Sequence, residues 1–355
     1  MPAADQDKGS SHQSGRIAII GLGLIGGSLG LAIKAAGLPL EVVGYDKEWG
    51  VAPKAQRLKA IDRAARDATS ATRDAALVII AVPTLAIREV MEEIAPTLEE
   101  GCIVTDTGST KADVLRWAGE LLPDRVDFVG GHPLAGKEQS GIEAADARLF
   151  AGAGYCLVPQ VNASERAISA ILGLVGILGA RPIFIDAEEH DSYLAATSHL
   201  PLVVSAALFS LVRNSQAWPD MAELAASGFR DLTRLASGDP NMSHDICITN
   251  REPILHWLDR MVEELSRYRE LIQGDDEELF KALAKTQLDR DAFLTEPPEG
   301  RRAPAPAEAD ILSSGERMAS FLVGEQWVRR ARDMTRALEE RDKDRARKGR
   351  RRRGP

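Results

Sequence analysis

The sequence predicts an α/β protein in which a doubly wound parallel sheet is followed by an all-helical domain. Over the first half of the chain, short apolar runs alternate with helical runs, a pattern typical of βαβ units. From about residue 187 the strand-like runs stop and long helical runs follow. A length of 355 residues fits two domains, because a single hydrophobic core stops growing near about 250 residues.

Each expected strand is a short continuous apolar run, which suits a strand buried in a parallel sheet. The expected strands are residues 16–20, 41–45, 77–82, 102–105, 128–130, 155–158 and 182–185. The helices expected between them are residues 24–36, 85–98, 112–121 and 165–178. The helices expected later in the chain are residues 191–213, 221–226, 246–273 and 277–293. The sheet domain is therefore expected to cover residues 16–186 and the helical domain residues 187–295.

Both ends of the chain differ from the rest in composition. Residues 1–15 are polar and predict a disordered tail, while residues 296–355 predict a Pro- and Ala-rich linker followed by a basic helical tail. Residues 329–355 hold thirteen Lys and Arg against five Asp and Glu, a net charge of +8 in a chain of formal net charge −9. Charge blocks of this kind commonly stay solvated, so nucleic-acid contact through this tail is not expected.

The overall composition is that of a soluble globular protein, with 44% hydrophobic and 27% charged residues. No segment predicts an export signal or a membrane span. Cys102, Cys156 and Cys247 lie far apart and lack the spacing of zinc ligands, so neither a disulfide nor a metal site is expected. The expected location is therefore the reducing cytoplasm.

A glycine-rich loop directly after the first strand predicts a dinucleotide site. Residues 21–26 read GLGLIG and open a helix, which is the arrangement of the Rossmann-type fold. Gly21 allows the tight turn, Gly23 lets a pyrophosphate approach the backbone, and Gly26 lets helix and strand pack closely. The helix N-terminus supplies N–H donors and a partial positive charge for the phosphates.

An acidic residue at the end of the second strand selects the cofactor. Asp46 lies 20 residues after Gly26, where a carboxylate accepts hydrogen bonds from both ribose hydroxyls and repels a 2′-phosphate. NAD is therefore expected rather than NADP. Val82 and Pro83 end another strand and are expected along the same crevice. The expected cofactor-binding residues are Gly21, Gly23, Leu24, Ile25, Gly26, Asp46, Val82 and Pro83.

Three later segments carry polar residues that the dinucleotide fold alone does not explain. Residues 105–111 (TDTGSTK) and 130–138 (GGHPLAGKE) each follow a strand, and ligands of open α/β sheets bind outside such strand ends. The third segment is helical and has two parts, residues 197–201 (TSHLP) and 228–234 (GFRDLTR). These segments predict the substrate site.

Together these segments closely resemble the prephenate/arogenate dehydrogenase family, the cyclohexadienyl dehydrogenases of tyrosine biosynthesis. The matching motifs are GLGLIGGS (21–28), DTGSTK (106–111), GGHPLAG (130–136), TSHLP (197–201) and GFRDLTRLASGDP (228–240). The resemblance extends from residue 16 to about residue 293. GGHPLAG and FRDLTRLA are specific, because neither follows from general Rossmann architecture. The resemblance implies an NAD-dependent oxidoreductase that forms a homodimer through its helical domain.

The resemblance also implies the chemistry, in which a dianionic cyclohexadienol acid loses hydride to NAD, loses a ring carboxylate as CO₂ and becomes aromatic. His132 would accept the proton of the ring hydroxyl, since an imidazole suits this task at neutral pH. Ser109 would bind the same hydroxyl or orient His132. His199 would complete the pocket near a substrate carboxylate.

Charged residues are expected to hold the substrate's carboxylates. Arg234 would bind one of them, because a guanidinium is a permanently charged, bidentate donor. Asp231 and Glu138 would pair with Arg234 and control access. Lys111 and Lys137 either attract the dianion or are ordinary solvated lysines. No role is predicted for His12, His190, His244 and His256.

The sequence leaves the substrate open among related acids. Prephenate carries a keto side chain and arogenate an amino acid, and the neighbours Lys137 and Glu138 favour opposite choices. Ser243 stands where the family often has tryptophan, which weakens inference about the substrate side chain. Oxidation of 4-amino-4-deoxyprephenate is an alternative that would use the same histidine and arginine.

Two more distant functions are also considered. A β-hydroxyacid dehydrogenase shares the glycine loop and a helical second domain, but it depends on a lysine in the helical part. Residues 187–250 contain no lysine, which argues against this class. A non-catalytic protein that senses NAD or binds nucleic acid would depend on the basic tail rather than on His132.

Overall fold

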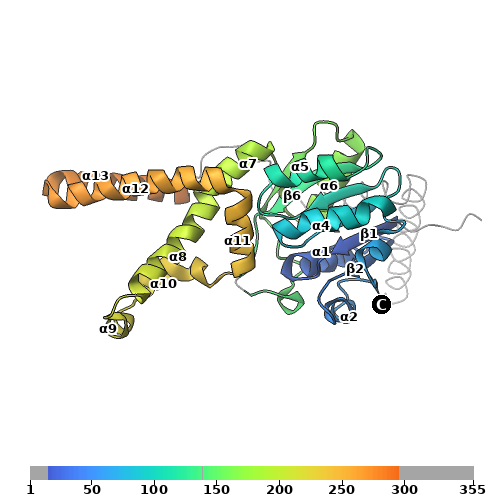
Figure 1. The fold of residues 1–355 in the computed structure, drawn as a ribbon, viewed down its shortest axis with the longest axis horizontal. Helices are drawn as coiled ribbons and strands as arrows, with labels where there is room; N and C mark the ends of the chain where they lie inside the picture. The colour runs from blue at the N-terminus through green and yellow to red at the C-terminus, as the bar shows by residue number, and fades with distance from the viewer. Residues whose placement is uncertain (1–14, 138, 296–355) are drawn as a thin grey trace, which may run out of the picture.

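A computed structural model describes residues 15–137 and 139–295 of the chain. These residues form a layered α/β part and a helical part that extends away from it (Figure 1). The α/β part is built on one eight-stranded sheet with the strand order β3-β2-β1-β4-β5-β6-β7-β8. The strands are β1 (Gly15–Ile20), β2 (Leu40–Tyr45), β3 (Arg63–Ala64), β4 (Leu77–Ile80), β5 (Ile103–Asp106), β6 (Asp127–Pro133), β7 (Gly154–Pro159) and β8 (Arg181–Phe184).

The fold class predicted from sequence is confirmed, with one correction to the direction of the last strands. Strands β1 to β6 are mutually parallel, whereas β7 runs antiparallel to β6 and β8 pairs parallel with β7. A parallel neighbour needs a crossover that returns the chain to the starting end of the sheet, usually through a helix. The connection at residues 134–153 contains only the 3₁₀ turn η2 (Ile142–Ala144) among its described residues, so the chain re-enters the sheet in the opposite direction.

Helices cover both faces of the sheet. They are α1 (Leu24–Ala35), α2 (Val51–Arg57), α3 (Ala68–Thr72), α4 (Thr84–Ile94) with the 3₁₀ turn η1 (Ala95–Thr97), α5 (Ala112–Leu121) and α6 (Glu165–Ile177). In β1, Ile17 and Ile19 pack into a core with α1 and α6, while Ala18 and Ile20 pack into a second core with α4 and α5. Burial on both faces explains why this strand is apolar throughout.

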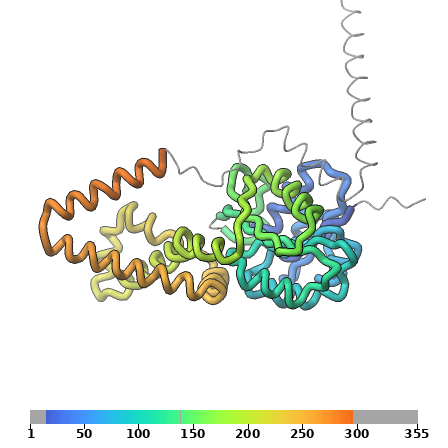
Figure 2. The backbone as a smooth tube through the Cα atoms, turned by 90° about the horizontal axis from the view of Figure 1, so that it is seen from above, coloured from blue at the N-terminus to red at the C-terminus, as the bar shows by residue number. Residues whose placement is uncertain are grey.

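The helical part contains a larger number of shorter helices than the sequence predicted. Its elements are α7 (Ala187–Leu194), η3 (Ala195–His199), α8 (Leu200–Arg213), α9 (Trp218–Glu223), α10 (Ser227–Thr233), η4 (Arg234–Ser237), α11 (Pro240–Thr249), α12 (Arg251–Gln273) and α13 (Asp276–Thr295). The helix predicted at residues 246–273 is divided at Asn250, whose backbone leaves the helical region (φ −128°, ψ 36°). Helix α10 lies at the segment 228–234, which the sequence predicted to be helical. Figure 2 shows α12 and α13 as an antiparallel hairpin that points away from the sheet.

Helices α7 and α8 form one continuous run that is interrupted by a single π-helical turn, η3. Pro201 follows this turn, and a proline ring lacks an N–H and clashes with the carbonyl four residues earlier. Widening the turn relieves this clash, and turns of this kind are frequent at functional sites. His199 ends the π turn and is buried.

Candidate active site

The glycine loop has the geometry that a dinucleotide requires. Gly21 has φ +90°, and a Cβ there would lie 2.3 Å from the carbonyl oxygen of Ala81. A Cβ on Gly26 would lie 1.9 Å from the carbonyl oxygen of Gly21, so the first turn of α1 packs directly on the loop. A Cβ on Gly23 would meet no atom of the described residues within 4 Å. The loop is therefore tightly packed at Gly21 and Gly26, whereas the space next to Gly23, at the N-terminus of α1, is open.

Asp46 is tied to this loop by backbone hydrogen bonds. Its Oδ2 accepts from the N–H of Leu22 at 2.7 Å, and its Oδ1 accepts from the N–H of Glu48 at 2.8 Å. Each carboxylate oxygen has a second lone pair for a ribose hydroxyl. These residues fit NAD: the open glycine and the helix N-terminus suit a pyrophosphate, and the oriented carboxylate suits the ribose. Leu24 and Ile25 begin α1, and half-buried Val82 and exposed Pro83 precede α4.

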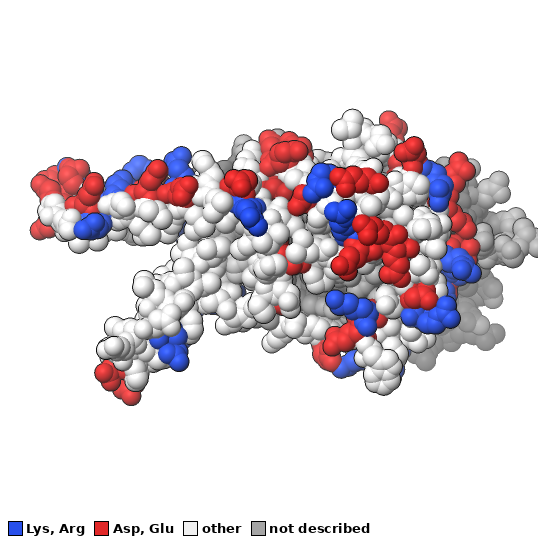
Figure 3. Space-filling model, viewed as in Figure 1, with Lys and Arg blue, Asp and Glu red and all other residues white. Residues whose placement is uncertain are grey.

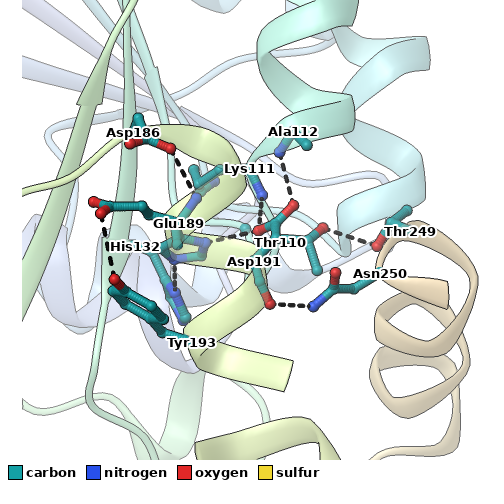
Figure 4. Close-up of polar contacts among 12 residues, drawn as sticks. Thr110, Lys111, Ala112, His132, Asp186, Glu189, Asp191, Tyr193, Thr249 and Asn250 are labelled. Carbon is teal, nitrogen blue, oxygen red and sulfur yellow. Dashed lines mark hydrogen bonds and ion pairs between the residues drawn. The ribbon is translucent and has the colours of Figure 1, made fainter. Parts of the chain in front are cut away.

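His132 lies near the end of β6 and is half-buried. Its Nδ1 lies 2.9 Å from Nε2 of His190 on α7, and Nδ1 of His190 lies 2.7 Å from Oδ1 of Asp191 (Figure 4). His190 is fully buried and Asp191 is 3% exposed. The histidine predicted to be the base is thus connected through a second, buried histidine to a carboxylate.

Asp191 also joins the helical part to the sheet part. Its carboxylate accepts from the backbone N–H groups of Lys111 at 2.7 Å and Ala112 at 2.9 Å, at the N-terminus of α5. A carboxylate at this position is favoured by the unpaired N–H groups and by the helix dipole. Asp245 of α11 makes the equivalent contact with α4, where it accepts from the N–H of Leu85 at 3.1 Å. Two carboxylates of the helical part therefore cap two helices of the sheet.

His199 belongs to the same network, but Asn250 connects it to the backbone carbonyl of Asp191 rather than to the Asp191 side chain. The side-chain nitrogen Nδ2 of Asn250 lies 2.7 Å from the carbonyl oxygen of Asp191 and 3.0 Å from Nδ1 of His199. His199 is 1% exposed, and its Nε2 has no hydrogen-bond partner among the described residues. Beside this network, the hydroxyls of Thr110 in the sheet part and Thr249 in the helical part lie 2.8 Å apart and form a hydrogen bond between the two parts.

A buried ion pair underlies the two loops that follow β5 and β6. Lys111 and Asp106 pair with their side chains fully buried. The carboxylate of Asp106 also accepts from the N–H groups of Gly108 at 2.7 Å and Gly131 at 3.1 Å. The pair thereby links the loop that contains Ser109 to the strand that carries His132. Lys111 is consequently a buried structural cation and not a solvated lysine.

The two histidines that were predicted to form the site, His132 and His199, are held in the neutral form. Burial, together with the neighbouring His190, Lys111 and His199, holds the pKa of His132 well below its usual range. Burial lowers the pKa of His199 to about 4, although the nearby Asp191 opposes this shift. At neutral pH each ring therefore carries one proton on one nitrogen and a lone pair on the other.

The remaining predicted residues lie on separate elements. Ser109 is half-buried in the loop between β5 and α5. Arg234 is exposed at the start of η4, which packs against α8 and α10. Asp231 is exposed on α10, and Glu138 lies outside the described residues. Lys137, paired with Asp146 at 3.2 Å, lies in the loop after β6.

Three residues of the network were not predicted from the sequence. His190 was assigned no role, and Asp191 and Asn250 were not singled out. No sequence signal singled them out, because α7 reads AEEHDSYL and the His-Asp pair stands among other polar residues. Ser109 was expected either to bind the substrate hydroxyl or to orient His132, whereas the hydrogen bond that the structure shows at Nδ1 of His132 joins it to Nε2 of His190.

The glycine loop, the oriented carboxylate of Asp46 and the neutral histidine at a neighbouring strand end define a nicotinamide-dependent dehydrogenase. Two family descriptions match the chain: "Prephenate dehydrogenase, nucleotide-binding domain" over residues 29–184 and "Prephenate dehydrogenase, dimerization domain" over residues 186–286. The chain belongs to the prephenate dehydrogenase family, as its motifs predicted.

Individual relatives agree with this assignment. A prephenate dehydrogenase of Bacillus subtilis (strain 168) is 37% identical over 275 residues, which cover 77% of this chain and 74% of that protein. A cyclohexadienyl dehydrogenase of Zymomonas mobilis is 36% identical over 278 residues, covering 77% of this chain and 94% of that protein. The predicted class of enzyme, an NAD-dependent oxidoreductase of this family, is thereby confirmed.

Solved structures of relatives have the same fold. Prephenate dehydrogenase from A. aeolicus, in complex with hydroxyphenyl propionate and NAD+, aligns with a TM-score of 0.74 at 28% identity. The alignment covers 80% of this chain and all of that one. Synechocystis arogenate dehydrogenase aligns with a TM-score of 0.68 at 29% identity over 78% of this chain and 99% of that one.

Proposed function

We propose that this chain catalyses the NAD-dependent oxidative decarboxylation of prephenate to 4-hydroxyphenylpyruvate. The observation that supports the proposal most directly is the neutral imidazole of His132, half-exposed at a strand end and anchored through its Nδ1. A base for a hydroxyl proton must be unprotonated at working pH and must present a free nitrogen to the substrate. His132 meets both requirements.

The proposed reaction divides the work between cofactor and protein. When bound, NAD accepts the hydride from the ring carbon that carries the hydroxyl. His132 accepts the hydroxyl proton through Nε2 as this bond breaks, and Ser109 hydrogen-bonds the same oxygen. The ring carboxylate leaves as CO₂ and its electron pair completes the aromatic ring, after which the proton returns to the phenolic oxygen. Aromatisation drives the step, so the protein supplies position and charge control.

The two carboxylates of the substrate require donors. His199 is proposed to donate from its buried Nε2 to one of them, because this nitrogen has no partner among the described residues. Arg234 is proposed to bind a carboxylate as well, with Asp231 and Glu138 modulating access to it. A buried polar atom left without a partner costs free energy, so a ligand that pairs with His199 is favoured.

A direct assay can determine which of three related acids the enzyme prefers as its substrate. NAD reduction should be followed with prephenate, arogenate and 4-amino-4-deoxyprephenate in parallel, with the variant His132→Asn as the matched control. The last compound is included because a 4-amino-4-deoxyprephenate dehydrogenase of Streptomyces pristinaespiralis is 26% identical over 63% of this chain. The highest kcat/KM should be found with prephenate, and a clear preference for either other acid would overturn the substrate assignment.

The enzyme is further proposed to act as a homodimer through its helical part. Large apolar side chains are exposed along α8 to α13, among them Leu211, Leu224, Leu232, Val262, Leu265, Ile272, Phe280 and Leu288. Figure 3 shows that the arm formed by α12 and α13 and the arm formed by α8 and α10 carry few charged side chains on the sides that face each other. A contiguous exposed apolar surface marks an interaction site, and a second copy fits the family description of this region.

The run Ala187–Arg213 illustrates the same point. An 18-residue window within it has a mean hydropathy of 1.7, which would suffice for a membrane span by length and composition, and only 17% of that window is buried within the chain. A partner copy that covers this helix accounts for its apolar character without a membrane. Sedimentation at micromolar concentration should show a dimer, and a monomer alone would contradict this. We place the enzyme in the cytoplasm, where its three free cysteines stay reduced.

A further inference from the structure

The hydrogen bonds around Asp191 have directions that follow from chemistry alone. A carboxylate and a peptide carbonyl accept hydrogen bonds and cannot donate them. Asp191 contributes both groups, its side chain toward His190 and its carbonyl toward Asn250. Each branch ends on one of the two active-site histidines. The position of the proton on each ring can therefore be deduced from Asp191 outward.

The side-chain branch determines the tautomer of His132. Oδ1 of Asp191 can only accept, so His190 donates to it from Nδ1 across 2.7 Å. A neutral His190 then has its lone pair on Nε2, which accepts from Nδ1 of His132 across 2.9 Å. The single proton of neutral His132 is thus on Nδ1. Its Nε2 carries the lone pair, which is the state required of a proton acceptor.

The main-chain branch determines the tautomer of His199, with the opposite result. The amide of Asn250 must turn Nδ2 toward the carbonyl of Asp191, because the reverse orientation would place Oδ1 of Asn250, an acceptor, against that carbonyl oxygen, which is also an acceptor. The same Nδ2 lies 3.0 Å from Nδ1 of His199, which therefore accepts. The proton of neutral His199 is consequently on Nε2. That buried nitrogen is a donor with no acceptor among the described residues.

We propose that Asp191 locks the two active-site histidines in opposite tautomers, with a lone pair on Nε2 of His132 and an N–H on Nε2 of His199. The two states match the two ends of the substrate, since a hydroxyl proton needs an acceptor and a carboxylate needs a donor. This inference deepens the proposed function and rests on it for the identity of the substrate. His190 and Asn250 act as positioning residues, because each works through another histidine.

The first test does not involve turnover. In the full-length enzyme labelled with ¹⁵N-histidine, ring nitrogen shifts distinguish a protonated from an unprotonated nitrogen, and substitution of single histidines assigns the signals. At neutral pH we expect His132 to be protonated on Nδ1 only and His199 on Nε2 only. The same tautomer on both rings, or a doubly protonated His190, would overturn the proposal whatever acid the enzyme oxidises.

The second test separates the two branches by kinetics. His190→Leu removes the acceptor for His132 and should lower kcat by about 10²–10⁴-fold, the usual range for a general base. His190→Gln keeps an acceptor oxygen at the end of the side chain and should recover at least about tenfold of this loss. Its KM for prephenate should stay within about twofold of the parent value. A His190→Leu enzyme with unchanged kcat would refute the side-chain branch.

The main-chain branch should show the opposite signature. Asn250→Asp turns an acceptor toward Nδ1 of His199, which moves the proton away from Nε2. KM for prephenate should rise about 10- to 100-fold, as expected for one lost hydrogen bond to a charged group. A fall in kcat at constant KM would contradict this branch.

Controls separate these effects from misfolding and from a wrong substrate. Exposed His256 on α12 provides the matched variant His256→Gln, which should leave kcat, KM and the ring signals of His132 unchanged. NAD binding and thermal unfolding should be measured for every variant, because a positioning role predicts no change in cofactor affinity. If prephenate proves inactive but the two tautomers are found, the proposed substrate fails and the tautomer lock stands.

Discussion

The buried pair of Lys111 and Asp106 provides a stability prediction of large size. Replacing Lys111 with methionine removes the cation and leaves a carboxylate with 0% exposure. Asp106 retains two backbone N–H donors, from Gly108 and Gly131, but loses its counter-charge. Removing one member of a buried ion pair costs about 3–5 kcal/mol. Lys111→Met should therefore lower the free energy of unfolding by about this amount at pH 7.

The dependence of this deficit on pH follows from proton binding. In the Lys111→Met protein, the folded state binds a proton at Asp106 more readily than the unfolded state does, because protonation removes an unpaired buried charge. Stability falls with rising pH wherever the folded state binds more protons. The deficit should accordingly be largest at neutral pH and shrink as the pH is lowered. In the double variant with Asp106→Asn, part of the stability should return, since no buried charge then remains.

Urea unfolding followed by circular dichroism, at pH 5 and pH 7 and at one fixed protein concentration, measures these effects. Fixed concentration matters because association of subunits adds to the apparent stability. A matched control is Lys285→Met, since Lys285 forms an exposed pair with Asp289 on α13. A deficit for Lys111→Met of no more than about 1 kcal/mol, the value of an exposed ion pair, would refute the reasoning.

Three further outcomes concern the site. His132→Asn should lower kcat by about 10²–10⁴-fold while NAD affinity, measured by fluorescence titration, stays unchanged; a similar kcat would exclude His132 as the base. Gly21→Ala should abolish NAD binding in the same titration, because its Cβ would lie 2.3 Å from a carbonyl oxygen, and intact affinity would contradict the loop geometry. Because the pKa of His132 is held well below 6.5, kcat should stay level as the pH falls through 6.5; half-maximal activity at that pH would be incompatible with this lowered pKa.

The sheet and the cofactor loop could be predicted because local sequence dictates them. A buried strand at residues 16–20, the glycine loop after it and Asp46 at the end of the next strand all lie within a single βαβ unit. This arrangement is characteristic of a dinucleotide-binding fold, so no contact with a distant segment was needed to predict it. The direction of β7 could not be predicted, because its apolar pattern is identical for a parallel and an antiparallel neighbour. Direction depends on the connection before it, whose lack of a long helix is only evident from the fold.

The candidate active site could be predicted only in part, since its hydrogen bonds join distant segments. GGHP identified His132 by resemblance, but the contact of His132 with His190 spans 58 residues and that of Asn250 with His199 spans 51. A single sequence contains no signal for such pairs. The interruption of the predicted helix at Asn250 has the same cause. That residue is held by contacts to α7 and η3, which outweigh the helix propensity of its neighbours.

The capping carboxylates explain why the cofactor is expected at α1 rather than at a neighbouring helix. Helices α1, α4 and α5 all begin at the carboxyl edge of the sheet, and each N-terminus attracts an anion. Asp245 occupies the N-terminus of α4 and Asp191 that of α5, whereas no side chain of the described residues caps α1. The strand order changes direction between β1 and β4, which places α1 beside the crevice where ligands bind. Because Asp191 also contacts His190, docking of the helical part fills the competing anion sites and aligns the proposed base, His132, in one step. A change that loosens this interface should therefore reduce kcat before it unfolds the sheet.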